Sequence, residues 1–150
     1  MSLDGVLLKQ PTLYLRLGRP EDADTIISLT SDLFALSPYS VVSSFDSVVV
    51  RENYLASLDL PKFEFVNILL CSGNEVIGFM SCGSNKGQFS EDRYAIEVGF
   101  YIKPEYKTIT ATKMLISAFH YWAREADCKA AFIGKMKDKK IETYKMKVLT

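Results

Sequence analysis

The stretch from Ala95 to Leu115, AIEVGFYIKPEYKTITATKML, constrains the fold of this chain more than any other segment. A nearly continuous apolar run predicts a buried, central strand over Arg93 to Lys103. Pro104 ends that run, and apolar residues then return at steps of three and four, which predicts an amphipathic helix. A strand that leads directly into a helix start puts unpaired backbone N–H groups beside the strand end, where anions bind readily. The segment therefore predicts a strand–loop–helix unit with a candidate anion site.

The composition favours one globular domain over residues 1–150. Of the 150 residues 48% are hydrophobic and 24% are charged, which is ordinary for a folded domain. Residues 1–12 carry little pattern, and we expect them to be poorly ordered. The formal net charge is zero, so no overall basic field would attract nucleic acid or an anionic membrane.

Cysteine and histidine usage argues against a metal site. The chain has three cysteines without metal-type spacing and a single histidine, so we expect no bound metal. Reduced thiols are the simplest state for such cysteines, and they favour a cytoplasmic location. The longest apolar runs have the length of strands, and no membrane span is predicted.

The order of predicted elements indicates a mixed fold of the α/β (α+β) class. A hairpin signal, Ser72-Gly73-Asn74, joins two β-rich runs in the middle of the chain. One crossover helix then connects two further strands. We expect a central mixed, mostly antiparallel sheet flanked by helices. The predicted strands are Leu13 to Leu17, Phe65 to Cys71, Glu75 to Cys82, Arg93 to Lys103 and Lys129 to Gly134; the predicted helices are Ala23 to Phe34, Ser44 or Asp46 to Leu58, and Ala111 to Ala126.

The segment from Asp138 to Thr150 fits two interpretations. Ile141, Tyr144 and Val148 would share one face of a helix, whereas Tyr144 and Val148 alternate with lysines as in a strand. We favour the helix. Lysines also gather near this end of the chain, either on a solvated face or as a phosphate-facing patch. They are Lys135, Lys137, Lys139, Lys140, Lys145 and Lys147.

This order resembles that of the GNAT family of acetyl-CoA-dependent N-acyltransferases. Three segments carry the likeness: LRLGRPEDADTI from Leu15, EVIGFMSCG from Glu75, and IEVGFYIKPEYK from Ile96. The last one ends in the family's apolar-x-Pro-x-Tyr-basic signature. The resemblance implies a GNAT-like fold, acetyl-CoA or coenzyme A as co-substrate, and transfer of an acetyl group to a primary amine of a small molecule or peptide.

The chain departs from the family pattern in its phosphate loop. Lys107 occupies the family's basic position, but Thr110 and Thr112 stand where the family has glycines. Glycine lets backbone N–H groups approach a pyrophosphate closely, because it has no Cβ. Threonine crowds that approach, yet its hydroxyl can bind phosphate or cap the helix. An alternative function follows, namely a catalytically degenerate GNAT-fold protein that acts by binding or assembly.

The chain also departs from the pattern at its C-terminal end. The family usually finishes with a helix and two strands after the strand at Gly134, and this chain is too short for all three. The C-terminal strands are therefore expected to be abbreviated or missing, or supplied by a partner. An exposed strand edge needs covering, and a homodimer is one arrangement that covers it.

The resemblance implies roles for particular residues. The backbone of Phe100, Tyr101 and Ile102 would hold the thioester arm and the oxyanion. Glu97 stands where several members carry a catalytic base, the alternative being an ordinary charged side chain on a partly exposed face. Tyr144 would protonate the leaving thiolate or else serve only in packing. The main chain of the loop would contact the phosphates through Lys107, Thr108, Ile109, Thr110, Ala111 and Thr112. Phe34, Tyr39 and Phe45 would line the acceptor pocket or serve as core and surface aromatics.

Overall fold

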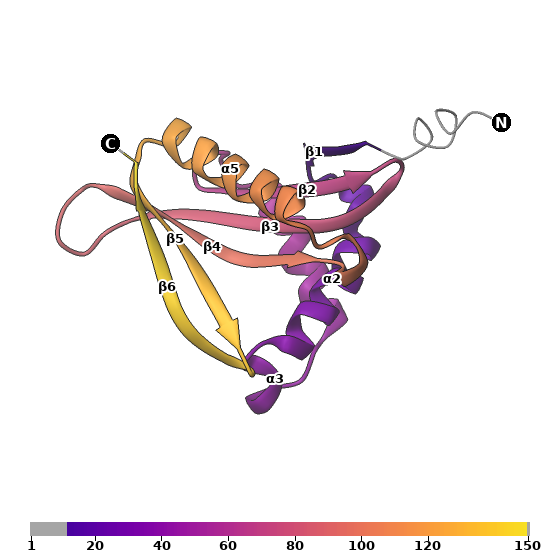
Figure 1. Ribbon diagram of the computed structural model, residues 1–150. Coiled ribbons are helices and arrows are strands. Elements are labelled where there is room, and N and C mark those ends of the chain that lie inside the picture. The colour runs from indigo at the N-terminus through magenta and orange to yellow at the C-terminus, as the bar shows by residue number, and fades with distance from the viewer. Residues whose placement is uncertain (1–11, 150) are drawn as a thin grey trace.

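One six-stranded sheet organises the chain (Figure 1). We analysed a computed structural model that describes residues 12–149. The strands lie in sequence order, and all neighbours are antiparallel except β4 and β5, which are parallel. The expected mixed, mostly antiparallel sheet is confirmed. The strands are β1 (Leu13–Leu17), β2 (Phe65–Ser72), β3 (Glu75–Lys86), β4 (Arg93–Ile102), β5 (Cys128–Lys137) and β6 (Lys140–Val148).

Helices cover both faces of this sheet (Figure 1). The long helix α5 lies on one face and connects β4 to β5, as a parallel pair requires. Helices α2 (Ala23–Leu36) and α4 (Ser47–Ser57) pack on the opposite face. The chain also forms the short helix α3 (Tyr39–Val42) and the 3-10 turns η1 (Pro20–Asp22) and η2 (Pro104–Tyr106), and α5 spans Ile109–Glu125.

Each face of the sheet has its own hydrophobic core. Under α5, Leu115 and Phe119 are completely buried against side chains of β2 to β5. On the other face, Leu29 of α2 and Tyr54 of α4 pack against Phe79 and its neighbours. Burying each such side chain contributes roughly 1.5–3 kcal/mol. The two cores clamp the sheet from both sides and hold the strands that form the site.

A partly buried ion pair fixes the connection between β1 and α2. The two terminal nitrogens of Arg16 donate to the two carboxylate oxygens of Asp22 at 2.7 and 2.8 Å, and the Arg19 N–H donates to the same carboxylate at 2.8 Å. These donors, Arg16 above all, lower the pKa of the buried Asp22 carboxyl. The Tyr54 hydroxyl also donates to the Arg19 carbonyl at 2.7 Å, which ties α4 to the same corner.

The preference for a C-terminal helix was wrong, because this segment is the strand β6. Asp138 and Lys139 both adopt left-handed backbone conformations, with φ of 52° and 58°, and make a tight turn after β5. Such a two-residue turn matches the twist of antiparallel strands. Tyr144 then lies directly opposite Gly134, which leaves room for its ring. The segment forms a strand and not a helix because its backbone pairs with the edge of β5.

The remaining boundaries are close to those expected. After β5 the described residues contain one strand, β6, and no helix. Asp46 caps α4, accepting hydrogen bonds from the N–H groups of Val48 and Val49. The short helix α3 was not predicted. A single domain over residues 1–150 stays a prediction, and the expected disorder of residues 1–12 falls, apart from Thr12, outside the described residues.

We expect Asp22→Asn to lower the free energy of unfolding by about 3 kcal/mol, because it leaves the Arg16 guanidinium without its partner. The folded-state pKa of Asp22 is depressed, so its stabilisation is present above the unfolded-state pKa and is lost as the pH falls through the folded-state pKa. Urea unfolding at pH 7 and in acid measures both effects. Asp24→Asn is the matched control, because Asp24 pairs with Arg51 at the surface. Equal losses in the two variants would contradict the prediction.

Candidate active site

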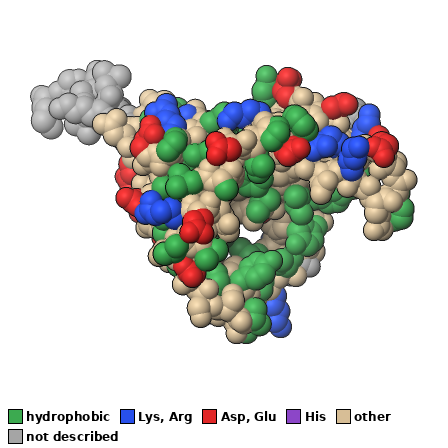
Figure 2. Space-filling view, turned by 180° about the vertical axis from the view of Figure 1, so that it is seen from behind, with side chains coloured by type: hydrophobic (Ala, Val, Ile, Leu, Met, Phe, Trp, Pro, Cys, Tyr) green, Lys and Arg blue, Asp and Glu red, His purple; other side chains and the backbone are tan. Residues whose placement is uncertain are grey.

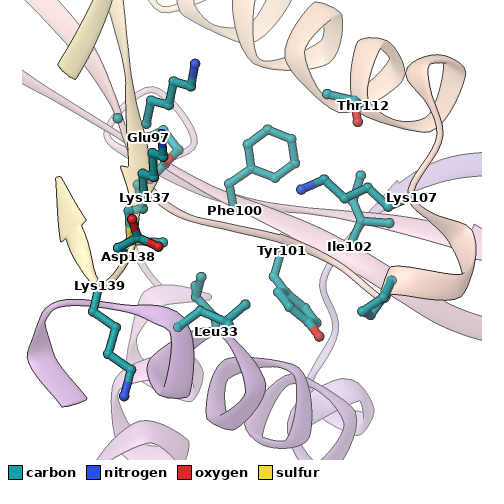
Figure 3. Close-up of a pocket in the computed structure, with 15 residues that line it drawn as sticks. Leu33, Glu97, Phe100, Tyr101, Ile102, Lys107, Thr112, Lys137, Asp138 and Lys139 are labelled. Atoms are coloured by element: carbon teal, nitrogen blue, oxygen red, sulfur yellow. The ribbon is translucent and has the colours of Figure 1, made fainter. Parts of the chain in front are cut away.

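The site begins where β4 and β5 separate. The two strands pair over only four residues of β4, ending at Ile96 beside Phe132. β4 then continues to Ile102 and β5 to Lys137 without pairing to each other. A cleft of about 730 Å³ opens between them, and α2 and the start of α5 contribute to its walls (Figure 3). Backbone groups of β4 on this side have no strand partner and can bind a ligand.

A β-bulge in β4 orients the side chains at this opening. Cys82 of β3 pairs with Glu97, and the β3 residue that precedes Cys82 pairs with Gly99. Val98 is therefore an extra residue in β4. Without this bulge, Glu97 and Phe100 would point to opposite faces of the sheet. With it, both lie on the α5 side and border the same cleft.

Glu97 is the carboxylate at the point of divergence. Its side chain is half-buried, and this burial raises its pKa to about 7. None of the hydrogen bonds among the described residues involves its carboxylate, which leaves it free for a ligand. A carboxylate with a pKa near 7 can take up or release a proton at neutral pH.

The loop between β4 and α5 borders the cleft through Pro104 and Lys107, and α5 borders it through Thr112. Thr108 caps α5, because its hydroxyl accepts a hydrogen bond from the Ala111 N–H at 3.1 Å. The N–H groups of Ile109 and Thr110 have no acceptor within the part of the chain that the structure describes. The Lys107 side chain extends into the cleft (Figure 3). The Ala111 N–H is thus already hydrogen-bonded to the capping hydroxyl, and the N–H groups of Ile109 and Thr110 remain available to an anion.

Two contacts hold the end of β4 in place. Lys103 forms a 2.6 Å ion pair with Glu75 of β3, and the Tyr106 hydroxyl donates to the same carboxylate at 3.3 Å. Gly78 allows the strands to approach closely, since a Cβ there would lie 2.8 Å from the Tyr101 carbonyl oxygen. The loop therefore starts from a fixed strand end.

A second cavity of about 390 Å³ adjoins the cleft and shares Glu97 and Phe100 with it. Phe34 and Tyr39 line this cavity, whereas Phe45 packs against Phe34 with ring centroids 5.7 Å apart. Tyr144 of β6 lines it as well, lying across Gly134, which borders both spaces.

Lysines make the first cleft basic. Lys107, Lys135, Lys137 and Lys139 border it, accompanied by two carboxylates. Three of these lysines belong to the β5–β6 hairpin, whose tip lies next to α3 (Figure 1). The phosphate-facing interpretation fits these three, whereas Lys140, Lys145 and Lys147 do not line the cleft.

Comparison with known proteins tests the fold. No family model matches the sequence, and no curated protein matches it. Among solved structures, a GNAT family acetyltransferase of Staphylococcus aureus matches at 15% identity with a TM-score of 0.68, covering 88% of this chain and 93% of its own. The aminoglycoside N-acetyltransferase AAC(6')-Iy in complex with CoA matches at 11% identity and a TM-score of 0.70, covering 85% and 80%. The chain has the GNAT acetyltransferase fold.

A third structure supports the same conclusion. It is an aminoglycoside acetyltransferase from an uncultured soil metagenomic sample, in complex with sisomicin. It matches at 17% identity with a TM-score of 0.62, covering 91% of this chain and 82% of its own. Such low identities establish the fold alone.

Within this GNAT fold the predicted site residues separate into two groups. Those that line the cleft or the cavity are Glu97, Phe100, Tyr101, Ile102, Lys107, Thr112 and Tyr144. Those that line neither are Thr108, Ile109, Thr110 and Ala111. Ala111 is completely buried in the α5 core. The contribution of these backbones to phosphate binding stays a prediction.

Sequence reasoning missed residues that long-range packing brings to the site. Leu33 of α2 borders both spaces, as do Gly134 and Met136 of β5. The only local signal was the Lys-Asp-Lys-Lys run that makes the hairpin turn. Among residues 12–149, no group of three His, Cys, Asp or Glu side chains could hold a metal ion, and no helix is long and apolar enough to cross a membrane.

We expect Thr108→Ala to lower the free energy of unfolding by about 1 kcal/mol, because it removes the α5 cap, whereas Thr108→Ser should retain it. Urea unfolding measures both. Thr110→Ala is the matched control, since its side chain is exposed and makes no hydrogen bond among the described residues. A Thr108→Ala variant as stable as the control would show that the cap contributes nothing.

Proposed function

We propose that this protein is an acetyl-CoA-dependent N-acetyltransferase that acts on a primary amine. The observation that carries the proposal is Glu97, a carboxylate with a pKa of about 7, at the point where β4 and β5 separate. It lies where a basic cleft meets an apolar cavity, so an anionic cofactor and an amine could meet beside it.

The cleft has the features that coenzyme A needs. Lys107 and the free N–H groups of Ile109 and Thr110 suit its pyrophosphate. The pantetheine arm would run between the diverging strands along the unpaired backbone of Phe100 to Ile102. The similar fold of AAC(6')-Iy, solved in complex with CoA, supports this assignment.

The proposed reaction follows from this arrangement. Glu97 accepts a proton from the substrate ammonium, directly or through a water molecule, and the neutral amine attacks the thioester carbon. Backbone N–H groups of Phe100 to Ile102 stabilise the oxyanion. The C–S bond then breaks, its electron pair stays on sulfur, and the Tyr144 hydroxyl supplies a proton to the thiolate. The second proton of the attacking nitrogen passes to the Tyr144 phenolate, which restores the hydroxyl and leaves a neutral amide. Tyr144 suits this role because it lies across Gly134, which borders both spaces.

Activity should depend on the ionisation of Glu97. We expect kcat/KM to rise as the pH increases towards about 7 and then to level off, because the base must be deprotonated. Glu97→Gln should lower kcat roughly 10²- to 10⁴-fold. Glu105→Gln, at an exposed position in η2, is the control and should leave kcat and the pH dependence of kcat/KM unchanged. A wild-type profile that is flat from pH 5 to 8 would contradict a role for Glu97 as base.

The same carboxyl should affect stability in the opposite direction to Asp22. Its pKa is raised in the folded state, so ionisation destabilises the fold as the pH rises from its unfolded value towards 7. We expect wild-type protein to lose stability relative to Glu97→Gln over this range in urea unfolding. This readout does not require any activity, and a constant difference between the two proteins would disprove the raised pKa.

Cofactor binding can be tested directly by calorimetry with acetyl-CoA and with CoA. Binding heat that disappears at high salt is expected, because the cleft is basic. Neither heat nor a thermal shift at millimolar ligand would refute the cofactor assignment.

The alternative function, binding or assembly without catalysis, rests on the helix start. Thr108 already occupies the Ala111 N–H, and Thr110 and Thr112 stand where the family carries glycines. The double variant Thr110→Gly/Thr112→Gly discriminates the two functions. If wild-type protein binds CoA as tightly as the variant does, the threonines are no obstacle and the alternative loses its support.

A further inference from the structure

We infer that the acceptor is a monoamine on a single apolar body, of the arylalkyl or branched-alkyl class, and that amines with several positive charges are excluded. This inference rests on the proposed function, because it names the acceptor of the same site. It concerns the second cavity, which lies between α2, α3 and the diverging strands.

The charge of the cavity limits how many ammonium groups it can hold. Of the fifteen residues that line it, only Glu97 is charged. One carboxylate can neutralise one ammonium, and a second ammonium would lose its hydration without an ionic partner. The cavity therefore suits a ligand with one positive charge, held next to the proposed base.

Aromatic side chains line the same cavity as that carboxylate. Phe34 and Tyr39 line the cavity from the helices, Phe100 from β4 and Tyr144 from β6. Aromatic faces attract an ammonium through cation–π interactions and also pack against an apolar body. This combination recognises a charged amine and its hydrophobic substituent together.

The remaining walls are largely apolar. Ile96 and Val98 of β4 line the cavity and are 43% and 60% exposed, as the space beside them is empty of protein. In the view of Figure 2, hydrophobic side chains lie along the right and lower sides of the hollow near the centre of the molecule. A ligand with an apolar body would cover these side chains, which favours its binding. The volume of about 390 Å³ lies within the range of small-molecule sites.

The adjoining cleft adds a repulsive element against polycations. Lys135, Lys137 and Lys139 of the hairpin border it, and Asp138 is its only carboxylate besides Glu97. A polyamine that extends from the cavity would meet this excess of positive charge. Aminoglycosides carry several ammonium groups, so the similarity in fold to aminoglycoside acetyltransferases does not extend to the chemistry of this pocket.

Steady-state acetylation assays with wild-type protein and acetyl-CoA test the inference. The acceptors are 2-phenylethylamine, isoamylamine, spermine and kanamycin. We expect kcat/KM for the two apolar monoamines to exceed that for the polycations at least about tenfold. Spermine or kanamycin as the better acceptor would overturn the inference while leaving the proposed function intact.

Variants of the lining sharpen the test. Ile141→Glu adds a second carboxylate to the cavity and should raise kcat/KM for spermine relative to 2-phenylethylamine. Val148→Glu, at an exposed position of the same strand outside the cavity, is the matched control and should leave this ratio unchanged. Phe34→Ala should raise the KM for 2-phenylethylamine. Equal ratios in both glutamate variants would contradict the inference.

Binding without cofactor separates this inference from the proposed function. If calorimetry detects no CoA binding and no acceptor is acetylated, the proposed function fails. Titration of 2-phenylethylamine and spermine into the protein without cofactor then tests the inference about the cavity. If 2-phenylethylamine binds more tightly than spermine and Phe34→Ala weakens this binding, the cavity is a monoamine site. If 2-phenylethylamine does not bind, or binds more weakly than spermine, the inference is refuted.

Discussion

The site depends on the loss of pairing between β4 and β5. Parallel strands joined by one helix normally continue side by side, yet here the ladder ends at Ile96 and Phe132 and both strands go on. Unpaired backbone groups inside a protein are costly unless water or a ligand satisfies them. The divergence therefore produces a cleft and supplies it with directional hydrogen-bonding groups.

The surrounding structure keeps the two strands apart. The α5 core holds β4 and β5 together at their paired end, whereas the Lys103–Glu75 ion pair and the close approach at Gly78 fix the far end of β4 to β3. β5 turns instead into the hairpin with β6 and is stabilised there. Because each strand is held by a different neighbour, the opening is a built-in feature of the fold.

Two chemical environments meet at this opening. The cleft on one side is basic and is bordered by Lys107 and Thr112, and the cavity on the other side is apolar and aromatic. Glu97 belongs to both, and its burial between them raises its pKa to about 7. The bulge at Val98 puts Glu97 on this border, so one extra residue in a strand couples the two binding spaces.

Sequence alone determined the features that depend on neighbours along the chain. These include the order of the elements, the amphipathic α5, the hairpin at Gly73 and the helix start after Pro104, because apolar periodicity and turn residues act over a few positions. Tertiary structure decided the rest. β6 is a strand because β5 offers it an edge, Glu97 shares a face with Phe100 because β3 accommodates a bulge, and the hairpin lysines reach the cleft because β5 leaves β4. Each of these depends on contacts between distant segments, which no local pattern encodes.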